Sequence, residues 1–178
     1  PWRAGLCREP RRGCARGQAH LAADGGQAAA GRDPVFLLRH LPRPRDFRDA
    51  QPFRHVAIDG FLDPAFCRAL LDEFPRFEDR YALNETGAVG GKAVRMDVRE
   101  ISDTYRALDR SIQAPEFLDL VSRITGIPDL LYDPDYIGGG THENVQGQGL
   151  DPHVDFNYHP GTRWHRRLNL IVYLNPEW

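Results

Sequence analysis

Apolar residues recur every three to four positions through much of residues 63–126, the period of helices with one buried face. Asp63 stands where an N-cap is expected, with Pro64 at the first helical position, and Ser102 and Pro115 open two more helices. Gly126 ends the third. The apolar faces consist of Phe66, Leu70, Leu71 and Phe74, then Ile101, Tyr105, Leu108 and Ile112, then Phe117, Leu118, Val121 and Ile124.

Strands are predicted before and after the three helices in the sequence. Residues 55–62 form an apolar stretch with a turn at Asp59 and Gly60, and beyond Leu130 the period shortens towards two. The later strands are expected at residues 132–137, 143–148, 153–158 and 168–174. In the last of these, one face consists of Leu168, Leu170, Val172 and Leu174, and the other consists of Asn169, Ile171 and Tyr173. The order of strand, helices and then strands predicts an α+β fold whose strands form a sandwich or a barrel.

Composition divides the 178 residues into two parts. Residues 1–50 are rich in Arg, Gly, Ala and Pro and predict a disordered or low-complexity extension, with a linker at residues 42–46. A basic arm that contacts a partner is the alternative. Residues 51–178 are expected to hold the folded domain.

The net charge and the hydropathy of the chain argue against several classes of function. The net charge of −2 gives no case for binding to nucleic acid or to a membrane, and no apolar run is long enough to span a bilayer. No secretory signal is recognisable. Cys7, Cys14 and Cys67 are too few and too widely spaced for a structural zinc site, so we expect free thiols in a reducing cytoplasm.

The candidate chemistry centres on His153 and Asp155. At positions i and i+2 of a strand they share one face, about 6.5–7 Å apart at the backbone, and their side chains can converge on one metal. A second histidine would complete the two-His-one-carboxylate triad of non-haem iron(II) oxygenases, which leaves three positions open for other ligands. Taken alone, so short a motif favours the simpler interpretation of a solvated histidine and an aspartate in a turn.

The surrounding sequence resembles prolyl-4-hydroxylase-like oxygenases, which depend on iron(II) and 2-oxoglutarate. That family shows a strand with a tyrosine, a glycine-rich turn, an H-x-D motif and a strand ending in YLN before an acidic residue and a tryptophan. In this chain, the corresponding elements are Tyr136 for the strand, residues 138–140 for the turn, His153 with Asp155 for the motif, and residues 173–178 for the final stretch. The resemblance covers about residues 53–178. It implies a jelly-roll, cupin-like double-stranded β-helix core, with N-terminal helices and the last strands missing.

The resemblance also implies roles for individual residues. His153 and Asp155 match the first two iron ligands. The residues that match positions near 2-oxoglutarate are Tyr136, Asn169, Ile171 and Tyr173. For the two tyrosines, core packing with a satisfied hydroxyl is the alternative.

In the family, the distal histidine ligand and the basic residue that pairs with 2-oxoglutarate come after the stretch that ends here at Trp178. We therefore expect an inactive fragment that binds iron weakly. His159 and His165 are too near His153 in sequence to be the third ligand, and His142 is a weak candidate. The loop after the metal motif is basic, with His159, Arg163, His165, Arg166 and Arg167. It is either a solvated loop or a rim that attracts an anionic substrate, with Trp164, His165 and Arg167 on the substrate side.

The activity implied by the resemblance is hydroxylation of a C–H bond in a peptide residue or a small molecule. Fe(II), 2-oxoglutarate and O2 take part, succinate and CO2 are released, and ascorbate keeps the iron reduced. One alternative is a non-catalytic binding or scaffold domain that keeps the fold. Another is a zinc-dependent or cupin-type metal protein that uses His142, His153 and Asp155.

Overall fold

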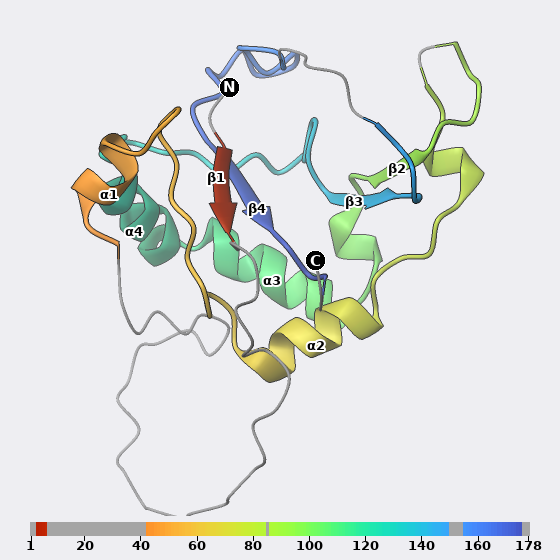
Figure 1. Ribbon diagram of the computed structural model, residues 1–178, viewed down its shortest axis with the longest axis horizontal. Coiled ribbons are helices and arrows are strands. Elements are labelled where there is room, and N and C mark those ends of the chain that lie inside the picture. Colours follow the sequence, from red (N-terminus) through yellow and green to blue (C-terminus); the bar gives the residue numbers. More distant parts are fainter. Residues whose placement is uncertain (1–2, 7–41, 85, 150–154, 176–178) are drawn as a thin grey trace, which may run out of the picture.

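The structure is a computed structural model that describes residues 3–6, 42–84, 86–149 and 155–175, with the backbone alone for residues 3–6 (Figure 1). His153, Cys7, Cys14 and residues 176–178 lie outside the described residues. The elements in chain order are β1 (Arg3–Leu6), α1 (Pro44–Arg48), α2 (Pro64–Asp72), η1 (Asp79–Tyr81), β2 (Lys92–Arg95), η2 (Val98–Glu100), α3 (Asp103–Gln113), α4 (Pro115–Thr125), β3 (Thr141–Asn144) and β4 (Asn169–Val172).

Helices α2, α3 and α4 confirm the three predicted helices and their end signals. Oδ1 of Asp63 accepts hydrogen bonds from the amides of Ala65 and Phe66, at 2.9 and 3.1 Å. Oγ of Ser102 accepts from the amide of Tyr105 at 3.2 Å. Each cap satisfies main-chain donors that a helix start leaves without partners. Gly126 closes α4 in the left-handed conformation, at φ +70°.

The main hydrophobic core lies where these helices meet. Its buried members are Phe61, Leu62, Leu70, Val98, Tyr105 and Phe117. The hydroxyl of Tyr105 donates to the carbonyl oxygen of Leu70 at 3.0 Å, which fixes α3 against α2. Val172 and Leu174 pack against this core, whereas Leu170, which was predicted to share their face, is exposed. Strand β4 is therefore anchored to the helices on one face, and Figure 1 shows it passing across α3.

The described strands form two small sheets. Strands β2 and β3 pair antiparallel, with Val94 opposite His142, while β1 and β4 pair in parallel, with Arg3 opposite Asn169. The described residues therefore combine helices with short strands, and the larger jelly-roll stays a prediction. None of the described helices has the length and apolar character needed to cross a membrane.

Some predicted elements differ from the structure. Residues 132–137 form turns instead of a strand, because the Asp133 carboxylate accepts the amides of Asp135 and Ile137, at 2.9 and 3.0 Å. Residues 55–58 form no strand, although the turn at residues 59–60 is present. Strand β3 begins two residues before the predicted 143–148 and ends at Asn144, and the described part of 153–158 holds a single bridge, between Tyr158 and His165. Strand β2 was not predicted.

The N-terminal extension also differs from the prediction. The segment expected to be a linker, residues 42–46, contains the start of helix α1. Pro44 is at its first position, and the Asp46 carboxylate accepts the amide of Arg43 at 2.8 Å. Phe47 is buried and α1 packs against α4, which ties this part of the extension to the domain. Strand β1 lies within the stretch expected to be disordered.

Candidate functional site

A tight hairpin returns the chain to the start of β4. The amide of Arg166 donates to the carbonyl of Asn157 at 2.8 Å, and the amide of His159 donates to the carbonyl of Trp164, also at 2.8 Å. We call residues 157–166 the basic hairpin. Because its two ends are joined by these bonds, Asp155 at its entrance lies beside Arg166 at its exit.

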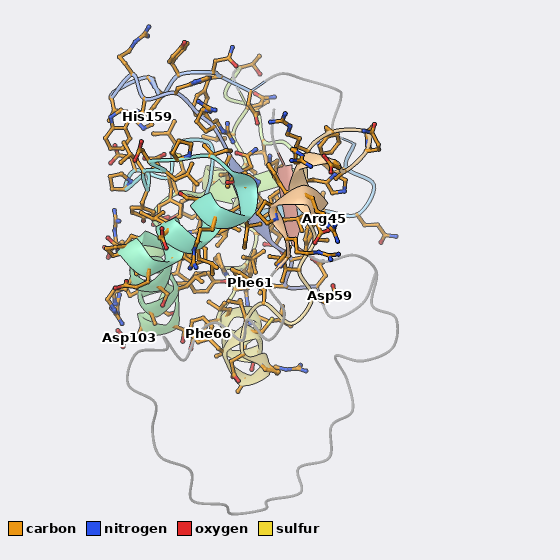
Figure 2. All side chains as sticks on the ribbon, turned by 90° about the vertical axis from the view of Figure 1, so that its left-hand side faces the viewer. Arg45, Asp59, Phe61, Phe66, Asp103 and His159 are labelled. Carbon is orange, nitrogen blue, oxygen red and sulfur yellow. The ribbon has the colours of Figure 1, made fainter. Side chains whose placement is uncertain are left out.

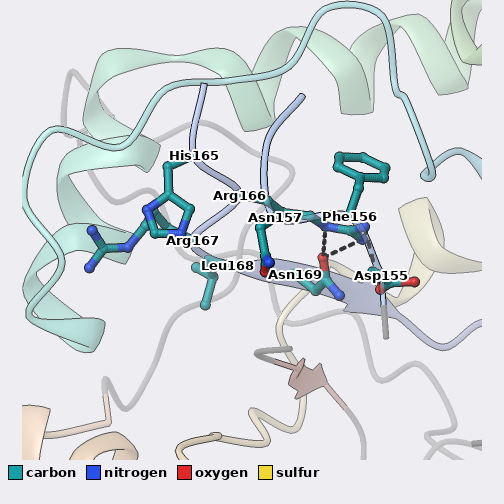
Figure 3. A pocket seen from close by; sticks show the side chains of 8 residues that line it. All are labelled: Asp155, Phe156, Asn157, His165, Arg166, Arg167, Leu168 and Asn169. Atoms are coloured by element: carbon teal, nitrogen blue, oxygen red, sulfur yellow. Dashed lines mark hydrogen bonds and ion pairs between the residues drawn. The ribbon is translucent and has the colours of Figure 1, made fainter. Parts of the chain in front are cut away.

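Arg166 joins the predicted metal ligand to the predicted cosubstrate residue on β4. Its Nη1 lies 3.4 Å from Oδ2 of Asp155, and its Nε and Nη2 donate to Oδ1 of Asn169 at 3.0 and 2.7 Å. The guanidinium also lies over the Phe156 ring, 4.8 Å from its centroid. Figure 3 shows the guanidinium between the two acceptors. Asp155 and Asn169, which are far apart in sequence, thus belong to one site.

The glycine-rich turn, residues 138–140, lies close to two residues of this site. A Cβ on Gly138 would lie 3.1 Å from Cε1 of Phe156 and 3.5 Å from Nη1 of Arg166, and the φ of Gly138 is +72°. The absence of a side chain therefore lets Phe156 and the guanidinium lie close to the turn. At Gly140, a Cβ would lie 2.0 Å from the carbonyl oxygen of Arg95, so the turn also lies directly against β2.

A hollow of about 60 Å³ opens at this place (Figure 3). Its lining residues are Asp155, Phe156, Asn157, His165, Arg166, Arg167, Leu168 and Asn169. The Asp155 side chain is 35% exposed and Arg166 is 21% exposed. The structure therefore brings together four of the predicted site residues, Asp155, His165, Arg167 and Asn169, around a hollow that two arginines and one carboxylate also line.

Other predicted site residues lie outside the lining of this hollow. Ile171 and Tyr173 continue along β4 and just beyond it, where both are half-buried. Trp164 is at the head of the basic hairpin, 41% exposed. His165 stacks on Tyr158 with the ring centroids 5.1 Å apart, so this rim histidine is held by an aromatic neighbour.

Tyr136 is directed towards helix α3. Its hydroxyl donates to Oδ1 of Asp109 at 2.9 Å, and the Tyr132 hydroxyl donates to the same oxygen. Asp109 is only 2% exposed and also accepts from Nε2 of Gln113 at 3.1 Å. Burial raises the pKa of Tyr132 to about 12 and raises that of Tyr136 further. This network fixes the turn that precedes Gly138, and sequence reasoning missed Asp109 as its centre.

His142 lies on β3, within the electrostatic reach of Asp155. Loss of water around the ring lowers the pKa of His142, and the Lys92 ammonium lowers it further, while the Asp155 carboxylate acts in the opposite direction. A lowered pKa keeps the imidazole neutral at pH 7, which is the form that binds metals. The zinc alternative also needs His153, which lies outside the described residues.

Asp133, Asp135 and His159 form a separate cluster that the sequence did not indicate. Their ligand atoms lie within 4.8 Å of one another, and His159 is 6% exposed. Nε2 of His159 lies 3.4 Å from Oδ1 of Asp133 and makes no hydrogen bond within the described residues. Figure 2 shows His159 at the end of the molecule away from Phe66.

The hydrogen bonds at the other nitrogen of His159 disfavour a metal in this cluster. Nδ1 accepts the amides of Gly161 and Thr162, at 3.1 and 3.0 Å, so Nδ1 carries the lone pair and a neutral ring carries its proton on Nε2. The nitrogen that faces the carboxylates is then a donor. Histidines that bind metals show the reverse arrangement, in which the distant nitrogen donates. We therefore assign the cluster a structural role, with the imidazole N–H directed at Asp133.

Comparisons of the chain with protein-family models, with curated proteins and with solved structures find no match. The assignment of function accordingly depends on the residues and on the resemblance described above.

Proposed function

We propose that this chain carries part of the active site of an iron(II)- and 2-oxoglutarate-dependent oxygenase of the prolyl-4-hydroxylase type. The observation that supports this most directly is the place of Asp155. Its partly exposed carboxylate stands at the edge of a hollow, beside the strand whose residues the resemblance assigns to the cosubstrate. His153, two positions earlier, is the proposed partner ligand.

The side chains around Asp155 suit an iron site. A hard carboxylate oxygen and imidazole nitrogens are the donors that non-haem iron(II) sites use. Ligating carboxylates are usually held in turn by hydrogen-bond donors, and the Arg166 guanidinium lies 3.4 Å from this one. When bound, iron would supply the activation of O2 that couples decarboxylation of 2-oxoglutarate to hydroxylation of a C–H bond.

The chain's own residues would orient the reactants. Asp155 would hold the metal. His165 and Arg167 extend on the other side of the hollow from Asp155, as Figure 3 shows, where the Arg167 guanidinium adds positive charge. Positive charge there favours the approach of an anionic cosubstrate or substrate. The Phe156 ring, which lies against the Arg166 guanidinium and the glycine-rich turn, gives the hollow an apolar part.

The experiment is a turnover assay on the full-length protein with Fe(II), 2-oxoglutarate, ascorbate and O2. Succinate release is measured alone and against a panel of peptides and small molecules. We expect release in the wild type and its loss in Asp155→Ala. The control is Asp119→Ala, which removes an exposed carboxylate of α4 paired with Arg123 at 3.2 Å. Equal succinate release by Asp155→Ala and the wild type would rule out the proposed role of Asp155.

A second candidate function is a binding or scaffold domain without catalysis, and the pairing of the Asp155 carboxylate with Arg166 favours it. An aspartate whose Oδ2 lies 3.4 Å from a guanidinium nitrogen also suits a purely structural ion pair. The two candidates differ in 2-oxoglutarate binding. Calorimetric titration of the metal-loaded protein with 2-oxoglutarate gives saturable heat for the oxygenase and none for the scaffold.

A further inference from the structure

The outer part of the basic hairpin presents aromatic and positively charged side chains to solvent. Residues 156–176 contain no aspartate or glutamate, whereas Arg163, Arg166 and Arg167 all lie within this stretch. Tyr158 and Trp164 are 52% and 41% exposed. Tyrosine, tryptophan and arginine are the residue types that most often dominate the binding energy of protein interfaces. The hairpin therefore has the composition of an interaction surface.

The hairpin is fixed in shape by its own contacts. Nδ1 of the buried His159 accepts two main-chain amides of the turn, at 3.1 and 3.0 Å. The Tyr158 ring stacks on His165, and the Arg163 guanidinium lies 5.9 Å from the centroid of the same tyrosine ring. We call the side chains of Tyr158, Arg163 and His165 the arginine–aromatic patch. A surface that is already ordered loses little conformational entropy when a partner binds.

Arg163 has a backbone conformation that favours other residue types. Its φ is +62°, in the left-handed region, where glycine and asparagine are less strained than residues with long side chains. The side chain is exposed, and it forms no ion pair with a carboxylate of the described residues. The fold therefore gains little from an arginine at this position. Strained residues of this kind are frequent at sites that hold ligands.

We propose that the arginine–aromatic patch binds an acidic segment of a partner protein. Arg163 and the exposed Arg167, which extends on the same side of the hollow as His165 (Figure 3), supply guanidinium donors that match carboxylates. The exposed ring of Tyr158 adds apolar area beside these charges. The proposal does not depend on the proposed function, because it involves neither a metal nor turnover.

Single-stranded nucleic acid is the other anionic partner to consider, and the ring contacts disfavour it. Nucleic-acid bases stack on the open faces of aromatic rings. In this hairpin the Tyr158 ring is already stacked on His165, and the Arg166 guanidinium lies over the Phe156 ring, 4.8 Å from its centroid. The net charge of −2 also opposes a long polyanion. A short acidic segment suits the patch better, because it needs guanidinium donors and no open ring faces.

The test is the fluorescence anisotropy of a labelled peptide of glutamate with interspersed leucine, titrated with the full-length protein in the presence of EDTA. We expect saturable binding that weakens as NaCl is raised, because salt screens exposed charges. Arg163→Asn should weaken binding about 10-fold or more, as is typical of an interface hot spot. It should not lower the melting temperature, because asparagine tolerates the left-handed conformation. Arg123→Gln removes an exposed arginine from α4 and should bind as the wild type does.

A matched peptide with glutamine in place of glutamate tests the requirement for charge. The proposal is overturned if the wild type binds neither peptide, if it binds both equally, or if Arg163→Asn binds as tightly as the wild type. Tighter binding of a thymidine oligonucleotide of equal charge would make nucleic acid the partner and would also overturn it. Arg167→Gln, which should weaken binding in the same direction, carries the test if Arg163→Asn does not fold. Because EDTA removes metals, none of these outcomes bears on the proposed function.

Discussion

Replacement of Asp109 by alanine tests whether the buried tyrosine network holds the turn beside the candidate site. The carboxylate is 2% exposed and accepts from the hydroxyls of Tyr132 and Tyr136 and from the amide of Gln113. Nη1 of Arg99 lies 3.6 Å from the same carboxylate. The substitution removes the acceptor that all of these donors share.

The magnitude follows from the donors that lose their acceptor. A buried donor without an acceptor costs about 1–3 kcal/mol, and the hydroxyls of both Tyr132 and Tyr136 lose their acceptor here. Arg99 is 47% exposed and keeps the Pro134 carbonyl at 2.7 Å, so it contributes little to the loss. We expect Asp109→Ala to lower the free energy of unfolding by about 3–5 kcal/mol, a large part of the usual 5–15 kcal/mol.

The assay is urea unfolding followed by circular dichroism, with the free energy and the slope fitted together. Asp119→Ala is the control, because it removes an exposed helical carboxylate that is also ion-paired, and should change stability by less than about 1 kcal/mol. Tyr136→Phe in both backgrounds measures the coupling between the two side chains. If Asp109→Ala unfolds at the same urea concentration as Asp119→Ala, the network does not stabilise the fold.

Two further predictions concern alkaline pH and the glycine-rich turn. Burial raises the pKa of Tyr132 to about 12 and raises those of Tyr105 and Tyr136, so their contribution to stability is complete below pH 10 and is lost as pH rises through the folded values. The melting temperature should therefore fall between pH 10 and 12, and a melting temperature that stays constant over this range would contradict the reasoning. Gly140→Ala places a Cβ 2.0 Å from a main-chain oxygen of β2 and should destabilise by more than about 2 kcal/mol. Gly147→Ala, at φ +85° with open space around it, should cost about 1 kcal/mol, and equal losses in the two variants would refute the steric argument.

The helices could be predicted from the sequence because their signals are local. Asp63, Ser102 and Gly126 lie within a few residues of the main-chain groups that they cap or terminate, and the apolar stripes between them have the helical period. Strand β2 escaped prediction because four residues in the order Lys, Ala, Val, Arg show no clear alternation. The strand predicted at residues 132–137 is absent because the Asp133 side chain competes for the amides that a strand partner would use.

The residues of the candidate site could be listed from the sequence, but their contacts could not. The i, i+2 spacing together with the resemblance singled out Asp155, and the alternation along residues 168–174 placed Asn169 on the face opposite the leucines. No pattern indicated that Arg166 would join them, because this depends on how the basic hairpin closes. Likewise, Tyr136 meets Asp109 across 27 residues of chain, so its partner follows only from the packing of the turn on α3.

The measurement that tests the central claim most directly is anaerobic Fe(II) binding by the full-length protein, quantified by equilibrium dialysis and metal analysis. Three proteins suffice: the wild type, Asp155→Ala, and Asp135→Ala, which alters the cluster around His159. We predict that Fe(II) binding is lost in Asp155→Ala and unchanged in Asp135→Ala. Binding that persists in Asp155→Ala and disappears in Asp135→Ala would place the metal in the other cluster and contradict the proposed site.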